Sequence, residues 1–235
     1  MSTAEPAKRL KYSYISIEGV IGVGKTSLCR LLASAFDART VLEKVEENPF
    51  LPAFYRDRTA NAFQTQIWFL LSRYRQLTQE AMQQDLFHDV TVADYMFAKD
   101  RIFAGINLDD QELALYNNIA AILEARIARP ELVIYLQAST EKILQRVEKR
   151  GRDYEFGMDK DYLAAINRAY DHFFFHHTES PVLVIDTNDI DFVENACDLQ
   201  EITEQIVQAG PGLNFYRPLG ARERSRLGGA AGKNR

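Results

Sequence analysis

The sequence predicts an α/β protein with a parallel sheet that is covered by helices on both faces. Short β-rich runs alternate with longer stretches that are apolar at helical spacing. A β-rich run near the N-terminus also leads into a glycine-bearing loop and a helix, the context in which phosphate-binding loops occur. Hydrophobic residues make up 46% of the 235 residues, so a domain with a large core is expected.

Five strands are predicted from short β-rich or apolar runs. They cover residues 12–18, 40–46, 89–94, 131–137 and 181–186. The spacing of apolar residues predicts helices over residues 25–36, 61–84, 109–128, 140–150, 159–176 and 193–208. Asp109 and Ser139 precede two of these helices and are the expected N-caps.

The two ends of the chain differ in composition from the rest. From Gly210 onward the sequence is rich in Gly, Pro and Arg, which predicts a mobile basic tail. A solvated end is favoured there over contact with RNA or an acidic partner. The predicted organisation is a domain over residues 13–208, an extension over 1–12 and a tail over 209–235.

Charge and cysteine content set limits on partners and compartment. A net charge of −5 does not favour nucleic acid as the main partner. No apolar run approaches the ~18 residues of a membrane span, and the N-terminus lacks the apolar centre of a secretory signal. Cys29 and Cys197 form no disulfide or metal-binding pattern, so we expect the cytoplasm and no membrane partner.

The phosphate-loop motif is the strongest single signal in the chain. The segment "IEGVIGVGKTSL" fits the pattern G-x-x-x-x-G-K-[ST], in which glycines let backbone N–H groups point at phosphate oxygens. The predicted nucleotide-binding residues are Gly19, Val20, Ile21, Gly22, Val23, Gly24, Lys25, Thr26 and Ser27. Lys25 is expected to reach the β- and γ-phosphates, and the Thr26 hydroxyl to bind Mg²⁺. The motif predicts ATP or GTP binding and leaves the phosphate acceptor open.

Acidic residues follow the second and third predicted strands. Asp94 comes directly after an apolar strand, where phosphate-loop enzymes place a second Mg²⁺ contact. The segment after the second strand offers Glu43, Glu46 and Glu47, and the residue pattern alone does not choose among them.

Three arginines gather at the end of the helix predicted over residues 140–150. Arg146 and Arg150 are four residues apart and share a helical face, and Arg152 follows Gly151. Arginines that close over a transferring phosphoryl group stabilise its charge, so a lid is predicted here.

These motifs together resemble those of the deoxyribonucleoside kinases, and most closely their bacterial deoxyadenosine/deoxyguanosine kinase branch. The resemblance covers residues 13–195 and is carried by five motifs in order: "IEGVIGVGKTSL", "EKVEENPFLPAFYRD", "FQTQIWFLLSRYRQL", "VADYMFAKDRIFA" and "RVEKRGRDYE". It implies a P-loop kinase fold with a five-stranded parallel sheet flanked by helices on both faces and an arginine-rich lid. It also implies a homodimer formed through residues 61–84 and 109–128.

The resemblance assigns roles to individual residues. It implies that Glu43 is the general base on the 5′-hydroxyl, a role a carboxylate near the γ-phosphate can fill. It further implies that Tyr55 and Glu155 hold the sugar 3′-hydroxyl, that Gln64 binds the base edge, that Asp100 lies near the base, and that Arg146, Arg150 and Arg152 form the lid. Trp68 and Leu71 either wall the base pocket or belong to the core.

The sequence departs from the family pattern at two positions. Many relatives carry Arg directly after the acid at position 94, whereas this chain has Tyr95. Lys99 or Arg101 could take over that cation's contact with Glu43, and the sequence does not choose between them. The proline that often follows the catalytic glutamate is Lys44 here, which we regard as minor.

The expected activity is ATP- and Mg²⁺-dependent phosphorylation of the 5′-hydroxyl of a deoxyribonucleoside, a purine in this branch, in nucleotide salvage. One alternative is a nucleoside monophosphate kinase of the thymidylate kinase type, which needs extra basic residues for the acceptor phosphate. The other is a catalytically silent nucleotide-binding protein. The sequence does not decide between adenine, guanine and cytosine, nor does it show feedback by a deoxynucleoside triphosphate.

Overall fold

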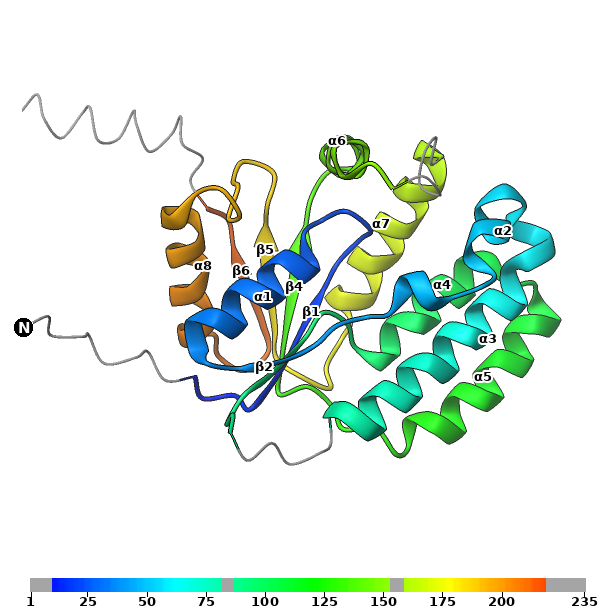
Figure 1. Ribbon diagram of the computed structural model, residues 1–235, viewed down its shortest axis with the longest axis horizontal. Helices are drawn as coiled ribbons and strands as arrows, with labels where there is room; N and C mark the ends of the chain where they lie inside the picture. The colour runs from blue at the N-terminus through cyan, green and yellow to red at the C-terminus, as the bar shows by residue number, and fades with distance from the viewer. Residues whose placement is uncertain (1–9, 82–86, 153–158, 219–235) are drawn as a thin grey trace, which may run out of the picture.

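Six parallel strands form a single sheet at the centre of the computed structural model, which describes residues 10–81, 87–152 and 159–218 (Figure 1). The strands are β1 (Tyr14–Glu18), β2 (Arg39–Val41), β3 (Thr91–Ala93), β4 (Leu132–Gln137), β5 (Val182–Asp186) and β6 (Leu213–Tyr216). Their order is β2-β3-β1-β4-β5-β6. In this order β1 pairs with β3 on one side and β4 on the other, so the phosphate loop that follows β1 leaves from the middle of the sheet.

The sixth strand corrects the prediction for the C-terminal part of the chain. Leu213–Tyr216 pairs in parallel with β5, so the expected five-stranded sheet has a sixth strand at its edge. The prediction of a mobile tail from Gly210 onward is therefore wrong for this segment, while residues 219–235 lie outside the described residues. Asn214 helps to shape the turn, since its side-chain nitrogen donates to the Gly210 and Gly212 carbonyls at 3.0 and 3.2 Å.

The second strand is shorter than predicted. It ends at Val41, and a 3₁₀ turn, η1 (Val45–Glu47), follows. Glu43 therefore lies in the connecting segment just beyond the strand end. This placement brings Glu43 to the edge of the sheet where ligands bind in parallel α/β folds.

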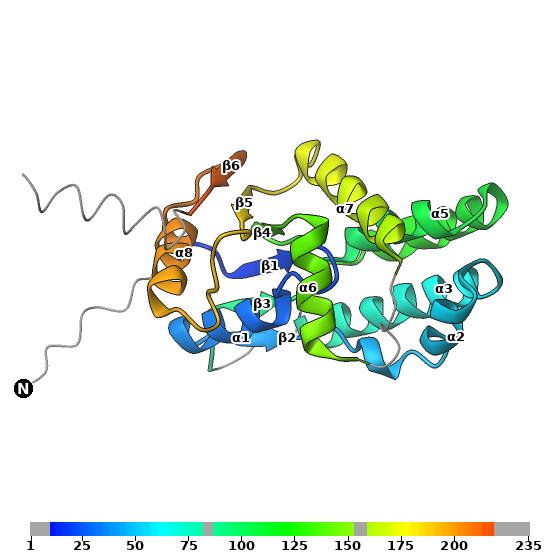
Figure 2. The same cartoon turned by 90° about the horizontal axis from the view of Figure 1, so that it is seen from above.

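Helices cover both faces of the sheet. Figure 2, seen from above, shows α1 (Lys25–Phe36) and α8 (Ala196–Gln208) on one side of the sheet and α7 (Lys160–Phe175) on the other. The helices α3 (Arg58–Gln76), α4 (Asp100–Asn107) and α5 (Asp110–Glu124) extend that second side, and α4 packs on α7. Two more helices, α2 (Leu51–Arg56) and α6 (Thr140–Arg150), lie toward the carboxyl ends of the strands.

Side-chain caps set the starts of the predicted helices. Asp109 accepts hydrogen bonds from the Gln111 and Glu112 backbone N–H groups, and Glu112 completes a capping box. Ser139 accepts from the Lys142 N–H. Both predicted N-caps are confirmed. The predicted helix over residues 61–84 begins earlier, at Arg58, and ends its α-helical part at Gln76, where a π-helical turn (Leu77–Ala81) follows.

The core lies on both faces of the sheet. Ile15 and Ile17 of β1 and Ile134 of β4 are fully buried, as expected for a parallel sheet with two covered faces. Behind the sheet, the Tyr135 ring stacks on Phe174 with centroids 4.7 Å apart. Among the described residues, none of the helices is both long enough and apolar enough to span a bilayer.

Candidate active site

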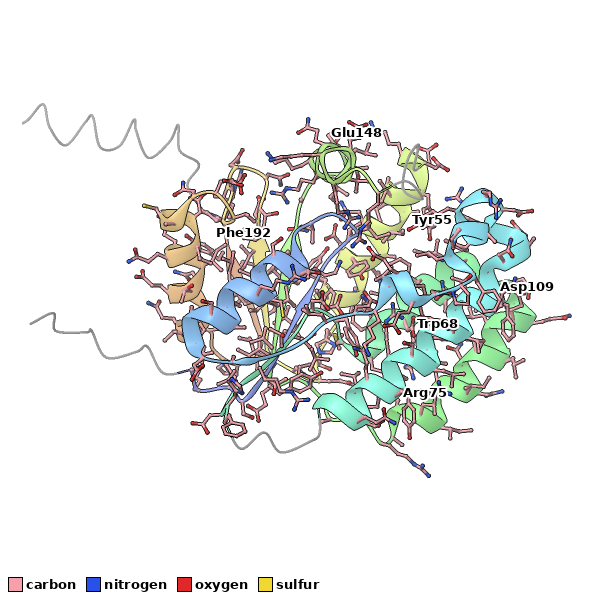
Figure 3. The ribbon with its side chains drawn as sticks, in the orientation of Figure 1. Tyr55, Trp68, Arg75, Asp109, Glu148 and Phe192 are labelled. Atoms are coloured by element: carbon pink, nitrogen blue, oxygen red, sulfur yellow. The ribbon has the colours of Figure 1, made fainter. Side chains whose placement is uncertain are left out.

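Two cavities meet above the carboxyl ends of the strands. The first has a volume of about 500 Å³ and extends from the phosphate loop to α2, α3 and α7, and the second, of about 520 Å³, extends to α6 and the loop before α8. Tyr55 lines the first cavity and Phe192 the second, and Figure 3 shows these two side chains well apart. The residues that line both cavities are Gly22, Lys25, Thr26, Arg30, Arg150 and Arg152. A phosphate held by this loop would therefore lie between two binding spaces.

The phosphate loop has the backbone shape that its glycines predict. Gly19 has φ 144° and Gly24 has φ 110°, a region that residues with a Cβ rarely adopt. A Cβ on Gly19 would lie 2.5 Å from the Leu136 carbonyl oxygen, and one on Gly24 would lie 2.8 Å from Cζ of Phe192. Both glycines are therefore required by conformation and by space.

Three predicted nucleotide and metal contacts lie together at the start of α1. The Lys25 ammonium donates to the Gly19 and Val20 carbonyls at 2.7 and 3.2 Å, which holds it over the loop. Burial, with the nearby Lys99 charge, lowers the pKa of Lys25 to about 8. The Thr26 hydroxyl donates to Oδ2 of Asp94 at 2.5 Å. A hydroxyl and a carboxylate side by side at a phosphate loop are hard oxygen donors of the kind that Mg²⁺ prefers, so these residues fit the predicted metal.

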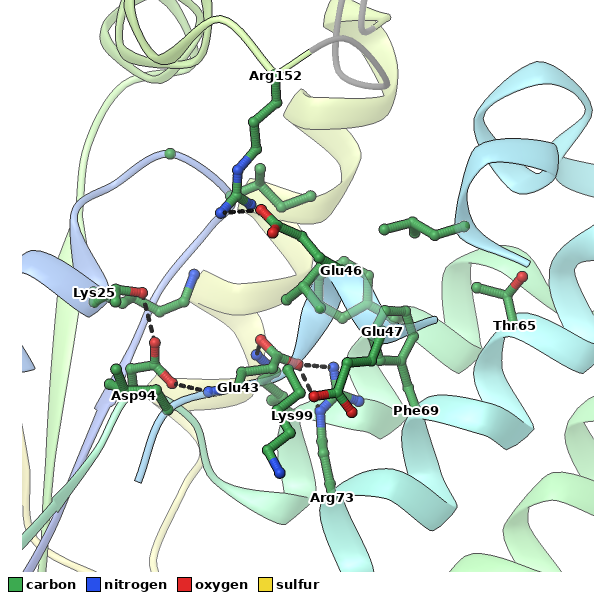
Figure 4. Close-up of a pocket in the computed structure, with 18 of the residues that line it drawn as sticks. Lys25, Glu43, Glu46, Glu47, Thr65, Phe69, Arg73, Asp94, Lys99 and Arg152 are labelled. Atoms are coloured by element: carbon green, nitrogen blue, oxygen red, sulfur yellow. Dashed lines mark hydrogen bonds and ion pairs between the residues drawn. The ribbon is translucent and has the colours of Figure 1, made fainter. Parts of the chain in front are cut away.

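Glu43 is fixed at both its backbone and its side chain (Figure 4). Its backbone N–H donates to Oδ1 of Asp94 at 2.7 Å. Its carboxylate accepts from Nε of Arg73 at 2.8 Å on one oxygen and from the Lys99 ammonium at 2.7 Å on the other. Burial alone would raise the pKa of Glu43, but Arg73 and Lys99 outweigh it and hold the pKa well below its usual range. Glu43 is therefore an ionised carboxylate on the wall of the first cavity.

A second buried acid, Glu18, lies beneath the phosphate loop and was not anticipated. Its carboxylate accepts from the Met96 N–H at 2.6 Å and from the Gly19 N–H at 3.4 Å, and it is fully buried. Burial raises the pKa of Glu18 to about 7, even though Lys99 and Lys25 act in the opposite direction. Glu18 comes directly before Gly19. Its position within the phosphate-loop motif was the one sign in the sequence that it belongs to the site.

Helix α3 presents a different face to the cavity from the one predicted. Gln66, Phe69 and Arg73 line the first cavity, whereas Gln64 does not. The Gln64 amide instead donates to the Ala60 carbonyl and to Asn61 within its own helix. Residues two apart on a helix point in directions about 200° apart, so the expected base contact of Gln64 is not supported. Gln66 is buried, and its Oε1 has no hydrogen-bond donor within the described part of the chain.

Trp68 and Leu71 lie on the same face of α3 as Gln64. They line a separate surface groove of about 350 Å³ beside Lys44 and Arg75, outside the first cavity. Figure 3 shows Trp68 and Arg75 along α3. The apolar walls of the first cavity come from other residues, namely Leu51, Phe54, Phe69, Phe103, Tyr162 and Tyr170.

The remaining predicted substrate contacts are Tyr55, Asp100 and Glu155, and they differ in position relative to the first cavity. Tyr55 of α2 lines the first cavity, as expected. Asp100 lies behind that wall, where it forms an ion pair with Arg73 and is 1% exposed. Burial raises the pKa of Asp100, which Arg73 opposes. Glu155 falls outside the described residues.

The three predicted lid arginines occupy two kinds of position. Arg150 and Arg152 line both cavities, and Arg152 pairs with Glu46 at 3.1 Å across the first one. Arg146 instead donates to the Val23 carbonyl at 3.1 Å and to the Thr187 carbonyl at 2.8 Å. It lines only the second cavity and joins the phosphate loop to the end of β5, so Arg146 is fixed where a mobile lid residue was expected.

The cation beside Glu43 is Lys99. Its ammonium contacts the Glu43 carboxylate, while Arg101 is exposed and pairs with Glu124. Tyr95 is fully buried, and its hydroxyl donates to Oε1 of Gln76 at 3.1 Å. The structure thus decides between the two candidates that the sequence left open.

The fold and the shared phosphate loop define a phosphotransferase with the P-loop kinase fold. Residues 15–209 match the model of the family described as deoxynucleoside kinase. The chain is 34% identical over 197 residues to a deoxyguanosine kinase of Bacillus subtilis, covering 82% of this chain and 95% of that protein. It is 35% identical over 214 residues to a deoxyadenosine kinase of Dictyostelium discoideum, covering 90% and 85%. The chain therefore belongs to the deoxynucleoside kinase family, whose members transfer phosphate to an alcohol.

A solved structure agrees with this assignment. The deoxyadenosine kinase from M. mycoides with bound dATP superposes with a TM-score of 0.71 at 25% sequence identity. The match covers 82% of this chain and 97% of that one.

Proposed function

We propose that this kinase transfers the γ-phosphate of ATP to the 5′-hydroxyl of a purine deoxyribonucleoside. The observation that carries the proposal is the ionised Glu43 carboxylate on the wall of a cavity that the phosphate loop also lines. A nucleotide on the loop and an alcohol in the first cavity would meet between Lys25 and Glu43. The relatives named for deoxyguanosine and deoxyadenosine support a purine acceptor.

The donor side rests on the phosphate loop and α6. Backbone N–H groups of the loop and the N-terminus of α1 would bind the phosphates, with Lys25 at the β- and γ-phosphates. The second cavity, between Arg146 and the loop that carries Phe192, would take the rest of the nucleotide. Thr26 and Asp94 would hold Mg²⁺, which neutralises phosphate charge when bound.

The chemical step would be carried by Glu43 and the lid. The carboxylate accepts the proton of the 5′-hydroxyl as the oxygen attacks the γ-phosphorus, and the bond to the β-phosphate oxygen breaks. Arg150 and Arg152 line both cavities and would stabilise the charge on the transferring group. The product is a deoxyribonucleoside 5′-monophosphate, which enters nucleotide salvage.

The acceptor would lie between aromatic side chains with polar groups at either end. Phe69 and Phe103 line the first cavity and offer apolar surface to a base. Gln66 presents an amide whose oxygen can accept and whose nitrogen can donate, as a purine edge requires. Tyr55 is the proposed contact for the sugar, together with Glu155, which stays a prediction.

A nucleoside monophosphate kinase is the weaker candidate, because the relatives named above are kinases of nucleosides. The charges of the first cavity do not exclude an acceptor phosphate. Glu43, Glu46 and Glu47 line this cavity together with seven cationic side chains, namely Lys25, Arg30, Lys44, Arg73, Lys99, Arg150 and Arg152.

A product assay tests the proposal directly. The purified protein is incubated with ATP, Mg²⁺ and each of the four deoxynucleosides separately, with adenosine as the ribose control. Monophosphates are then resolved by chromatography. We expect product from deoxyadenosine or deoxyguanosine and little from adenosine. Product from deoxynucleoside monophosphates alone would favour the monophosphate kinase, and ATP binding with no product at all would favour a silent binding protein.

We also propose a homodimer that forms through α3 and α5. Exposed apolar side chains on these helices support it, namely Leu71, Leu115 and Ile122, which are 37%, 51% and 70% exposed. Sedimentation of wild type and Ile122→Glu tests this, with Phe175→Ser of α7 as a control. Only Ile122→Glu is expected to be a monomer, and a monomeric wild type would contradict the proposal.

The cytoplasm remains the proposed location, since Cys29 and Cys197 are both free thiols.

A further inference from the structure

We propose that Lys99 is the residue that positions the Glu43 carboxylate for proton abstraction. The inference rests on the function proposed above and adds a specific role for a buried lysine four residues after Tyr95. Lys99 acts through Glu43, so it is a positioning residue.

The contact between the two side chains is direct and buried. The Lys99 ammonium donates to Oε2 of Glu43 at 2.7 Å, and the Lys99 side chain is 3% exposed. Arg73 occupies the other oxygen, Oε1. A carboxylate whose two oxygens are held by cations from two different elements cannot rotate without breaking one ion pair. This arrangement fixes the plane of the carboxylate at the cavity wall.

The two cations are not equivalent. Arg73 divides its charge between Glu43 and Asp100, and both of these ion pairs are buried. Within the described residues, Glu43 is the one carboxylate in ion-pair contact with Lys99. Arg73 therefore links Glu43 to a buried acid behind the cavity wall, whereas Lys99 contacts Glu43 directly while its charge also acts on the more distant Glu18.

The backbone keeps Lys99 and Asp100 at opposite ends of this network. They are consecutive residues at the junction of the 3₁₀ turn η3 (Phe97–Lys99) and α4. The chain of contacts runs from Lys99 through Glu43 and Arg73 to Asp100, and so returns to the residue next to its start. Such a closed network ties the Glu43 carboxylate to the junction of η3 and α4.

Other charged and titratable groups also lie around Glu43. They are Lys25 of α1, Glu18 of β1, Asp94 after β3, Arg73 of α3, Asp100 of α4 and Tyr170 of α7. Removing Lys99 leaves these groups in place and removes one of the two cations that hold the Glu43 carboxylate.

The first test compares Lys99→Gln, Lys99→Arg and Arg101→Gln in the deoxynucleoside assay. We expect Lys99→Gln to lower kcat about 10- to 100-fold through a misplaced base, with little change in KM for the deoxynucleoside. Lys99→Arg should recover most of that loss, because it restores the cation. Arg101→Gln is the matched control, since this neighbouring cation is exposed and pairs with Glu124, and its kcat should equal that of wild type.

A double-mutant comparison separates positioning from simple structural support. If Lys99 acts through Glu43, Lys99→Gln costs nothing further in a Glu43→Gln background. Equal losses in both backgrounds would overturn the inference, as would wild-type kcat in Lys99→Gln. Nucleotide binding by each variant, measured by calorimetry, identifies any variant that fails to fold. If Lys99→Gln fails to fold, Lys99→Arg takes its place in the comparison of the two backgrounds. An inactive wild type would instead count against the proposed function.

Discussion

Glu43 is a single carboxylate whose protonation state depends on two cations. Because Arg73 and Lys99 hold its pKa well below the usual range, Glu43 is ionised at neutral pH. We expect Glu43→Gln, which keeps the shape and removes the base, to lower kcat about 10²- to 10⁴-fold. Steady-state assays with a saturating deoxynucleoside check this. Glu148→Gln, an exposed glutamate on α6, serves as the control, and full turnover by Glu43→Gln would refute the mechanism.

Gln66 is the glutamine of α3 that lines the first cavity, the proposed acceptor site. Gln66→Ala should raise KM for the deoxynucleoside about 10-fold, the value of one hydrogen bond of roughly 1.4 kcal/mol. Gln64→Ala, two residues away on the same helix, should leave KM unchanged because the Gln64 amide donates to Ala60 and Asn61 of its own helix and does not line the first cavity. Measuring KM for both variants shows which face of α3 contacts the deoxynucleoside. A raised KM for Gln64→Ala with an unchanged KM for Gln66→Ala would instead support the base contact predicted for Gln64 from the sequence.

The α3 face shows where residue-level prediction reached its limit. Gln64 and Gln66 lie two residues apart in one motif, and helical periodicity alone does not say which of them turns inward. Tertiary contacts decided it, since Gln66 is buried and Arg73, two turns further on, pairs with Glu43 and Asp100 from distant segments. By contrast, Lys25, Thr26 and Asp94 lie together beside the phosphate loop, because the loop motif and a strand end define their positions locally.

At the scale of elements, the phosphate loop depends on glycine and α4 does not. Gly19→Ala should lower the free energy of unfolding by more than about 1 kcal/mol, because φ is positive and the Cβ would meet the Leu136 carbonyl. Gly105→Ala in α4 should raise it by about 0.5–1 kcal/mol, since a Cβ there meets nothing within 4 Å. Urea denaturation of both variants checks the pair. A stable Gly19→Ala protein would contradict the loop geometry.

Elements were predictable where local signals were strong. The helices over residues 25–36 and 140–150 have the predicted ends, because α1 follows the glycine loop and α6 lies between Ser139 and Gly151. The strands β2 and β6 have three and four residues, too few for a periodic pattern. Their pairing depends on β3 and β5, neighbours that are distant in sequence, so that information is not local.

At the scale of the whole molecule, one buried acid makes stability depend on pH. The pKa of Glu18 is raised to about 7 from an ordinary value of 4.5, so the folded protein binds this proton more tightly than the unfolded chain. The stabilisation from this proton is present at low pH and is lost as pH rises through about 7. Glu18→Gln should therefore gain stability relative to wild type between pH 5 and pH 8.

Thermal unfolding of the two proteins across this pH range measures the effect. The difference in Tm between Glu18→Gln and wild type should shift in favour of the variant as pH rises. The exposed Glu148→Gln should keep a constant difference from wild type. A difference in Tm between Glu18→Gln and wild type that does not change with pH would show that Glu18 does not hold its proton near neutrality.

Asp94 joins the two halves of the site through a single carboxylate, with Thr26 on one oxygen and the Glu43 backbone on the other. A shift of Thr26 on nucleotide binding would therefore reach the catalytic base Glu43 through a single residue, Asp94. Thermodynamic reciprocity then requires that the acceptor change donor affinity by the same factor by which the donor changes acceptor affinity. The enzyme would not behave as two independent binding sites. Its two substrates would instead be cooperative ligands of one another, linked through a side chain that neither need touch directly.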